Sequence, residues 1–309
     1  MRKDAENKFS PKYLTATLVA GLLLISAAQA KEYDGVWFLG LNLDKEIFKK
    51  VEVRRAFSHA IDRSTIVQTI VSEEVVPKGV IPPGMAGYDA SLEGYAYDVG
   101  LAKQLMKQAG VGMSDPRLKN MVLLHTDGVK TVAIAEQISR DLQKIGAKVI
   151  LKQVSYSDQS RWYFELKSEK YDLFLMGYKG GEIGTLLIGD KKSGLFHSVG
   201  CEKIPAPDNQ QLFGSYEEAL AAHYAPDPSC KPQPSKKLDT HGLLEPLFHW
   251  GGSANFTGYK NSRVDIYLDQ VEELDPTLTE MRNARFRAIN QLIMRDTPVV
   301  PLFYIQKEL

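Results

Sequence analysis

Strand-like and helix-like segments alternate between Met121 and Tyr178, and this alternation constrains the fold of the 309-residue chain more than any other feature. The last segment, YDLFLMGY, is a nearly unbroken apolar run, as is typical of a strand covered by helices on both faces. A βαβαβ run predicts an α/β fold with a mostly parallel sheet, right-handed crossovers and flanking helices. The predicted strands are Met121 to His125, Lys148 to Val154 and Tyr171 to Tyr178, and the predicted helices are Thr131 to Ile145 and Asp158 to Ser168.

Helical patterns also precede this run. An amphipathic stripe predicts one helix over Val51 to Val71. A second helix should begin after Asp98 as its N-cap and end before Gly110, a residue type that suits the position after a helix. Gly146 should end the helix within the βαβαβ run in the same way.

The C-terminal part returns to regular structure after a long interruption. A helix is expected near Val264 to Leu274, followed by a longer helix from Asp275 as N-cap to Arg295. Val299 to Tyr304 should then form a short strand. Because Pro301 has no N–H group to donate, this strand is predicted at an edge of the sheet.

The interruption, residues 179–243, is rich in proline and glycine, and we expect an irregular insertion there with one short helix near Ser215 to His223. Both cysteines of the chain, Cys201 and Cys230, fall in it. In an exported protein such a pair most simply forms a disulfide, which would stabilise the insertion by about 3 to 4 kcal/mol in the chain-entropy model. A metal site that adds His197 and His223 is the alternative, although this spacing lacks the closely paired ligands of zinc sites. The sequence favours the disulfide, and no metal or cofactor is predicted.

The first thirty residues read as a secretory signal peptide. A basic start is followed by the apolar run Leu14 to Ile25 and by Ala28-Gln29-Ala30, a small-x-small cleavage site. A membrane anchor is the competing interpretation, but the apolar run is shorter than the roughly 20 residues that a membrane span needs. We therefore expect cleavage after Ala30 and a soluble periplasmic protein. By length, residues 31–309 could form one large domain or two small ones.

Charge and motifs exclude several classes of function. The 38 basic and 38 acidic side chains balance, which argues against nucleic-acid binding. The chain has no P-loop, no G-x-S-x-G, no H-E-x-x-H and no C-x-x-C, and histidines such as His59, His125 and His249 are scattered. An enzyme is therefore not predicted.

Several longer segments occur in an order that closely resembles one protein family. These are VRRAFSHAIDRSTIVQTIV, IPPGMAGY, YAYDVGLAKQLMKQAG, YDLFLMGY, SANFTGYKNSRVDIYLDQ and RFRAINQLIMRDTPVVPLFY. The chain resembles the extracytoplasmic solute-binding proteins of family 5, the peptide-binding components of ABC importers. This resemblance implies the C-terminal lobe of a class II periplasmic-binding-protein fold, with a peptide or other small solute as ligand and ABC permease subunits as partners.

The resemblance also implies where a ligand would bind. In the family, an aromatic residue just past the YDLFLMGY strand packs on the peptide, and an aspartate two or three residues later receives the α-amino group. Tyr178 matches the aromatic position, whereas Gly181 stands at the aspartate position with Glu182 beside it. Trp250 is a further candidate ligand contact.

The family normally has a further lobe ahead of YDGVWFLGLNLDKE, so the resemblance implies a single lobe here, with weak or partner-dependent binding. A separately encoded N-terminal lobe or a homodimer would supply the second wall of the cleft. Phe38, Leu39, Tyr178 and Trp250 are expected to form exposed apolar cleft surface that suits a protein partner. The alternative hypothesis is a repurposed envelope interaction module without a transport role, or a decayed binding protein.

Overall fold

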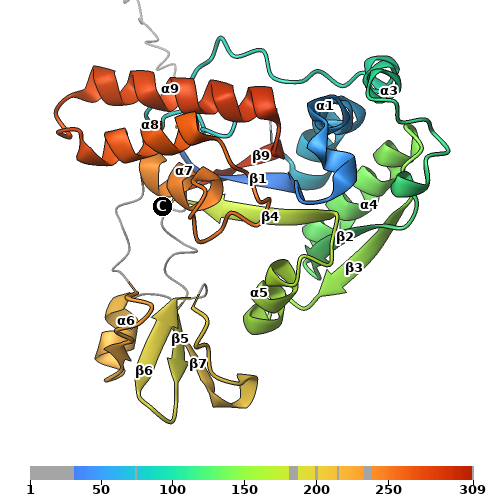
Figure 1. Cartoon of the computed structure of the whole chain (residues 1–309). Coiled ribbons are helices and arrows are strands. Elements are labelled where there is room, and N and C mark those ends of the chain that lie inside the picture. The colour runs from blue at the N-terminus through green and yellow to red at the C-terminus, as the bar shows by residue number, and fades with distance from the viewer. Residues whose placement is uncertain are drawn as a thin grey trace, which may run out of the picture. The chain divides into compact units, whose positions relative to one another are not determined.

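A five-stranded sheet with the strand order β3-β2-β4-β1-β9 is the centre of the fold in the computed structural model (Figure 1). The structure describes residues 31–73, 75–180, 187–198, 201–213, 216–232 and 239–307, and the predicted signal peptide lies outside these ranges. The strands of the sheet are β1 (Tyr33–Leu41), β2 (Met121–Thr126), β3 (Val149–Val154), β4 (Leu173–Lys179) and β9 (Val299–Gln306).

The predicted βαβαβ run is present and forms one half of this sheet. β2 pairs in parallel with both β3 and β4, and the connections contain α4 (Val129–Gln143) and α5 (Gln159–Lys167). The other half is antiparallel, because β1 pairs antiparallel with β4 and with β9. The expectation of a mostly parallel sheet therefore holds only where helices connect the strands. β9 lies at an edge, as Pro301 predicted.

Helices cover both faces of the sheet, because alternate residues of each strand point to opposite sides. Leu39 and Leu175 belong to a core shared with α1 (Val51–Ala60), α3 (Val99–Gln108) and α4. Phe38 and Phe174 belong to a second core shared with α5, α7 (Thr240–Phe248), α8 (Ser262–Glu273) and α9 (Thr279–Asp296). The expectation that Phe38 and Leu39 are exposed is wrong, since both lie on β1 between the two helical layers.

The helix predicted over Val51 to Val71 is interrupted. α1 ends at Ala60, and a new start follows as α2 (Arg63–Thr65) and the π-helical turn η2 (Ile66–Val71). The physical cause is Asp62, whose Oδ1 accepts a hydrogen bond from the backbone N of Thr65 at 3.1 Å and so caps the second segment.

α9 begins later than the sequence indicated. Asp275 Oδ1 accepts from Thr277 N at 2.8 Å, which forms a turn, and the helix starts at Thr279. The N-cap of α3 follows the prediction: Asp98 Oδ1 accepts a hydrogen bond from Leu101 N at 2.8 Å. The described residues also contain three short 3₁₀ turns, η1 (Glu46–Lys49), η3 (Pro116–Leu118) and η4 (Pro207–Asn209).

The insertion contains a second sheet, so the expectation of sparse regular structure there is wrong. Four short strands have the order β7-β5-β6-β8 and are accompanied by the predicted short helix, α6 (Tyr216–Ala221). Their bounds are β5 (Leu187–Asp190), β6 (Leu195–Ser198), β7 (Gln210–Phe213) and β8 (Ala225–Pro226). The sheet has its own small core of Leu187, Phe196, Phe213 and Ala219. Strands of two to four residues are too short for their alternation to be recognised between prolines.

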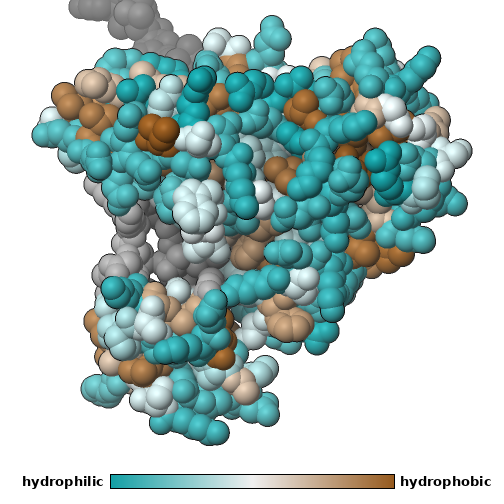
Figure 2. Space-filling view, in the orientation of Figure 1, coloured by the Kyte–Doolittle hydropathy of each residue, from teal (hydrophilic) through white to brown (hydrophobic). Residues whose placement is uncertain are grey.

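The face shown in Figure 2 is mostly hydrophilic, and its hydrophobic residues lie in separate spots rather than in one continuous patch. Scattered apolar residues of this kind are normal on a protein surface. Among the helices of the described ranges, none is long and apolar enough to cross a membrane.

The two predicted helix-ending glycines offer a matched test of backbone strain. Gly110 and Gly146 have φ values of +70° and +92°, in the left-handed region. Alanine at Gly110 would meet no neighbouring atom, so we expect a loss of about 1 kcal/mol from strain alone. Alanine at Gly146 would place its Cβ 2.5 Å from the carbonyl oxygen of Met113, and we expect a loss of about 2 to 3 kcal/mol. Urea unfolding of both variants checks this, and equal losses would contradict the packing argument.

Candidate ligand-binding site

Tyr178, the predicted ligand contact, is part of the core. Its side chain is 1% exposed and shares the helix-covered face of β4 with Phe174 and Met176. Burial raises the pKa of its hydroxyl, which has no hydrogen-bond partner among the residues described. The expectation that Tyr178 forms exposed cleft surface is therefore wrong. Residues two apart on a strand point to the same face, so Tyr178 faces the same core as Met176 and Phe174.

A pair of opposite charges lies at the carboxyl end of β4. Lys179 Nζ is 3.9 Å from Asp34 Oδ2, and the two side chains are only 13% and 12% exposed. The antiparallel register of β1 and β4, in which Gly35 faces Lys179, brings them together. The carboxyl ends of parallel strands are where open α/β sheets bind ligands. The chain continues from here into Gly181 and Glu182, which lie outside the described residues.

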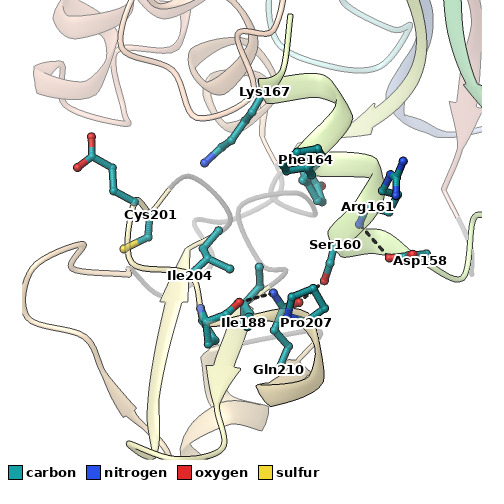
Figure 3. A pocket seen from close by; sticks show the side chains of 14 residues that line it. Asp158, Ser160, Arg161, Phe164, Lys167, Ile188, Cys201, Ile204, Pro207 and Gln210 are labelled. Carbon is teal, nitrogen blue, oxygen red and sulfur yellow. Dashed lines mark hydrogen bonds between the residues drawn. The ribbon is translucent and has the colours of Figure 1, made fainter. Parts of the chain in front are cut away.

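A groove with a volume of about 800 Å³ lies between α5 and the insertion (Figure 3). From α5, Figure 3 shows Lys167 extending toward the insertion. Ser160 Oγ donates to Gln210 Oε1, and Gln210 Nε2 donates to Pro205 O at 2.7 Å, so that α5 is joined to the segment leading into β7. The residues that line the groove include Arg161, Phe164 and Lys167 from α5 and Ile188, Ile204 and Pro207 from the insertion.

Ion pairs orient the α5 side of this groove. Glu165 is buried on the inner side of the helix, where its carboxylate accepts from Lys152 Nζ at 2.5 Å and from Arg161 Nε at 3.0 Å. The hydrogen bond from Lys152 lowers the pKa of Glu165, so the carboxylate is ionised at neutral pH. Phe164, on the outer side, is 66% exposed. The groove thus combines an exposed aromatic ring, apolar side chains, the cations Arg161 and Lys167, and the carboxylates Asp158 and Glu202. This lining suits a small, partly apolar ligand that carries both charges.

Trp250 lies apart from the residues that line this groove. It follows α7, its side chain is 65% exposed, and its backbone N donates to Asp265 Oδ1 at 3.0 Å. The predicted ligand contacts Tyr178 and Trp250 are therefore not brought into one groove by the residues that the structure describes.

Cys201 and Cys230 lie near each other, as predicted, but both are free thiols rather than a disulfide. His197 lies beside both, with its Nδ1 facing the two sulfur atoms. His223, the other histidine of the insertion that the metal alternative included, is exposed and is not part of this cluster.

Sequence reasoning did not identify the groove on α5. Its one detectable signal was Phe164, an aromatic residue beside the charged Arg161 and Lys167 on the polar side of an amphipathic helix. The other side of the groove belongs to the small sheet of the insertion, which the sequence did not predict. A groove formed by two such segments is visible only after folding.

Comparison with curated proteins finds relatives named for short peptides. Di/tripeptide-binding protein 2 of Pseudomonas aeruginosa is 27% identical over 183 residues, which are 58% of this chain and 33% of that protein. The dipeptide-binding protein of Escherichia coli is 30% identical over 148 residues, which are 47% of this chain and 27% of that protein. The chain thus spans about a third of the length of these relatives.

Solved structures share the fold. HbpA2 from Haemophilus parasuis aligns with a TM-score of 0.63 and 17% identity, covering 90% of this chain and 43% of that one. AppA from Bacillus subtilis, solved with a nonapeptide, aligns with a TM-score of 0.58 and 18% identity, covering 89% and 45%. The expected α/β fold of the periplasmic-binding-protein type is therefore confirmed.

The sequence also matches a family profile, "Bacterial extracellular solute-binding proteins, family 5 Middle", over residues 7–184. This range is more than half of the chain and includes β1 to β4 of the central sheet. With the shared fold and the relatives named above, the match shows that the chain belongs to the bacterial extracellular solute-binding proteins of family 5.

Proposed function

We propose that this chain binds a peptide-type solute in the α5 groove as the solute-binding component of an ABC importer, and that it is not an enzyme. The groove is the observation that carries the proposal, because its volume of about 800 Å³ lies within the range of roughly 300 to 1,000 Å³ that is usual for small-molecule sites. Family membership and relatives named for di- and tripeptides support a peptide as the ligand.

The groups along the groove match the parts of a short peptide. Arg161 and Lys167 offer cations to a peptide carboxylate, and Phe164 and Ile204 offer apolar surface to its side chains. The α-amino group needs a carboxylate partner. By the family resemblance we assign this role to Glu182, which with Gly181 follows β4. Trp250 does not line the groove, and we assign it no contact with the peptide there.

We further propose that binding by this chain alone is weak. Phe164 is two-thirds exposed, so a peptide on it would retain much of its hydration while losing translational and rotational freedom. A second wall, from a separately encoded lobe or a second copy of the chain, would bury the ligand and present it to permease subunits. Export by the signal peptide, with cleavage after Ala30, would place the protein in the periplasm.

The proposal predicts weak, groove-dependent binding of mixed di- to pentapeptides. For residues 31–309 we expect dissociation constants weaker than about 0.1 mM, or about −5.5 kcal/mol. Phe164→Ala should lower the affinity at least about fivefold, because it removes about 1 kcal/mol of apolar contact. Trp250→Ala, an equally exposed aromatic residue outside the groove, should change it less than twofold. Chemical-shift titration by NMR measures binding in this range.

Other outcomes would change the assignment. A monomer that binds peptide below about 1 μM, or −8 kcal/mol, would contradict the need for a second wall. Loss of binding in Trp250→Ala but not in Phe164→Ala would move the site away from α5. No binding, with an unrelated envelope protein rather than permease subunits in a periplasmic pull-down, would support the repurposed interaction module.

A further inference from the structure

Three metal-binding side chains converge at one end of the insertion sheet. His197 Nδ1 is 3.6 Å from Cys201 Sγ and 3.5 Å from Cys230 Sγ, and these three atoms all lie within 4.8 Å of one another. His197 and Cys201 are buried, and Cys230 is partly buried. Nothing in the groove chemistry described above uses these groups together.

The strand pairing of the insertion builds this cluster. β6 and β8 are parallel, with Leu195 facing Ala225 and Phe196 facing Pro226, so the residues that follow the two strands meet at the same edge. His197 lies near the end of β6, and Cys201 N donates to the backbone O of Ser198, the last residue of that strand, at 2.9 Å. Cys230 comes from the turn after β8.

The three side chains approach one another more closely than their individual hydrogen bonds require. A neutral imidazole nitrogen has a single lone pair and can accept one thiol proton, yet both sulfur atoms approach the same Nδ1. Cys230 Sγ has a second acceptor, Asp227 Oδ1, but at 3.8 Å this contact is longer than its contact with His197. The carboxylate of Asp227 approaches that nitrogen too, with Oδ2 at 3.7 Å, which is beyond the 2.7 to 3.2 Å usual for a hydrogen bond from nitrogen to oxygen.

The distances fit the edges of a coordination tetrahedron. With zinc–sulfur bonds of about 2.3 Å and a zinc–nitrogen bond of about 2.05 Å, the tetrahedral angle sets the sulfur–nitrogen separation at about 3.6 Å. Both observed separations match this value. We propose that His197, Cys201 and Cys230 bind one zinc ion, or a divalent cation of similar softness. Binding forms one nitrogen–metal and two sulfur–metal bonds and releases the two thiol protons to solvent.

Asp227 supports this site from the outside. Its Oδ1 accepts from Ser229 N at 2.7 Å and from Cys230 N at 3.2 Å, which positions the turn that carries Cys230. Its Oδ2 faces His197 and adds negative charge beside the cation. Oxygen from this carboxylate or from water would complete the four ligands that zinc prefers.

A metal cross-link would give the insertion the stability that its core cannot supply. Within the described residues, that core has only four buried side chains, with the partly buried Tyr216 and Tyr224 packed against them. Sheets with so little apolar burial usually depend on a disulfide or a metal. Cys201 also lines the α5 groove together with Ile204 and Pro207, so the ion would fix that side of the groove. This inference does not depend on the proposed function, because metal binding is measured without peptide.

Anaerobic titration of the reduced mature chain with Co²⁺ tests the site. We expect one Co²⁺ per chain with thiolate-to-cobalt charge-transfer absorbance, displacement by one Zn²⁺, and slower proteolysis of the insertion in the zinc-bound form. His197→Ala, Cys201→Ser and Cys230→Ser should each weaken Zn²⁺ binding at least about 100-fold. His223→Ala, the exposed histidine of the same insertion, should leave it unchanged.

The wild-type chain keeps the proposal testable even if a variant fails to fold. Absence of the charge-transfer band in the reduced wild-type protein would overturn it. Protein purified from its native compartment without zinc, lighter by two hydrogens and without free thiols, would also overturn it in favour of the disulfide. Equal loss of binding in His223→Ala would show that the ion binds elsewhere.

Discussion

Replacing Phe174 with alanine is expected to lower the free energy of unfolding by about 3 to 5 kcal/mol, because it leaves a cavity at the centre of the sheet. Phe174 lies on β4 and is fully buried. Its ring makes edge contacts with Phe38 at 6.0 Å, Tyr171 at 5.4 Å and Phe256 at 6.4 Å between centroids. The ring also lies against the backbone of Gly40, where a Cβ would be 2.2 Å away. So tightly enclosed a site cannot collapse when the ring is removed.

The matched control is Phe164→Ala, which removes the same side chain from the exposed side of α5 and should change stability by less than about 0.5 kcal/mol. Denaturant unfolding followed by circular dichroism compares the two variants. Similar losses in both would contradict the burial that the structure assigns. This control also separates folding from binding, since Phe164→Ala should weaken peptide binding without destabilising the protein.

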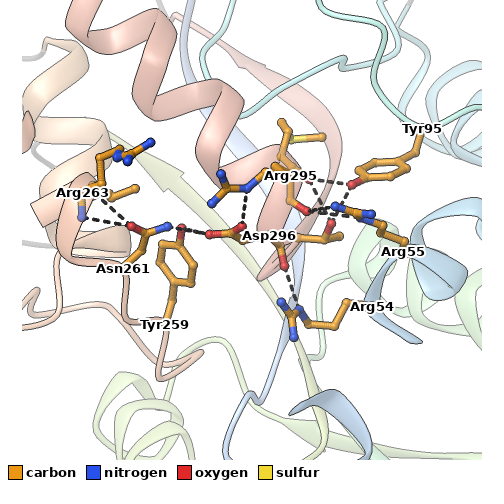
Figure 4. A network of polar contacts seen from close by, with 11 residues as sticks. Arg54, Arg55, Tyr95, Tyr259, Asn261, Arg263, Arg295 and Asp296 are labelled. Carbon is orange, nitrogen blue, oxygen red and sulfur yellow. Dashed lines mark hydrogen bonds and ion pairs between the residues drawn. The ribbon is translucent and has the colours of Figure 1, made fainter. Parts of the chain in front are cut away.

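Replacing Asp296 with alanine is expected to cost about 2 to 4 kcal/mol at neutral pH, because it leaves several polar groups without their partner. Its Oδ2 accepts from Tyr259 Oη at 2.8 Å and from Asn261 Nδ2 at 2.6 Å, and its Oδ1 accepts from Arg295 Nε at 2.8 Å (Figure 4). The backbone O of Asp296 accepts from Arg54 Nε at 2.8 Å. One residue thus joins the end of α9 to α1 and to the start of α8.

The contribution of Asp296 should depend on pH. Burial by itself would raise its pKa, but hydrogen bonds from Arg295, Tyr259 and Asn261 outweigh burial and lower the pKa below the ordinary value of 3.8. A carboxylate whose pKa is lowered by folding stabilises the protein fully above the unfolded value, and this stabilisation is lost as pH falls through the folded value. The difference in stability between wild type and Asp296→Asn should therefore be largest near pH 7 and shrink below pH 3.8.

Urea unfolding of both proteins at several pH values measures this dependence. Asp269→Asn is the control, because Asp269 is 65% exposed and its Oδ1 is 3.5 Å from His249 Nε2, a contact with a solvent-exposed carboxylate that is worth less than about 1 kcal/mol. A constant difference between wild type and Asp296→Asn across the acidic range would contradict the ion-pair interpretation and leave only a packing role for Asp296.

These contacts explain part of the sequence resemblance in physical terms. Arg54 and Arg55, from the first matching segment, donate to the carbonyl oxygens of Asp296 and Arg295 at the C-terminus of α9, where cations are favourable. Tyr95 Oη donates to Met294 O at 2.6 Å in the same turn. Four of the six matching segments therefore meet at one structural junction rather than at the α5 groove. This is why they reveal the fold more clearly than the solute.

The sequence alone determined the elements whose signals are local. Side-chain periodicity located β2, α4, β3, α5 and β4, glycines marked the ends of α3 and α4, and Pro301 placed β9 at an edge. Short-range patterns suffice there because helix caps, turns and amphipathic stripes depend on residues only a few positions apart. The order of the matching segments was sufficient to identify the family.

Only the tertiary structure decided how distant segments pair. It placed β1 between β4 and β9, buried Tyr178, formed a second sheet from the insertion, and brought His197 to Cys230, 33 residues away. The groove on α5 arises in the same way, from a helix and a sheet that are separate in the sequence. Such contacts are stabilised by burial and hydrogen bonding across the folded chain, and no local pattern records which segments will share them.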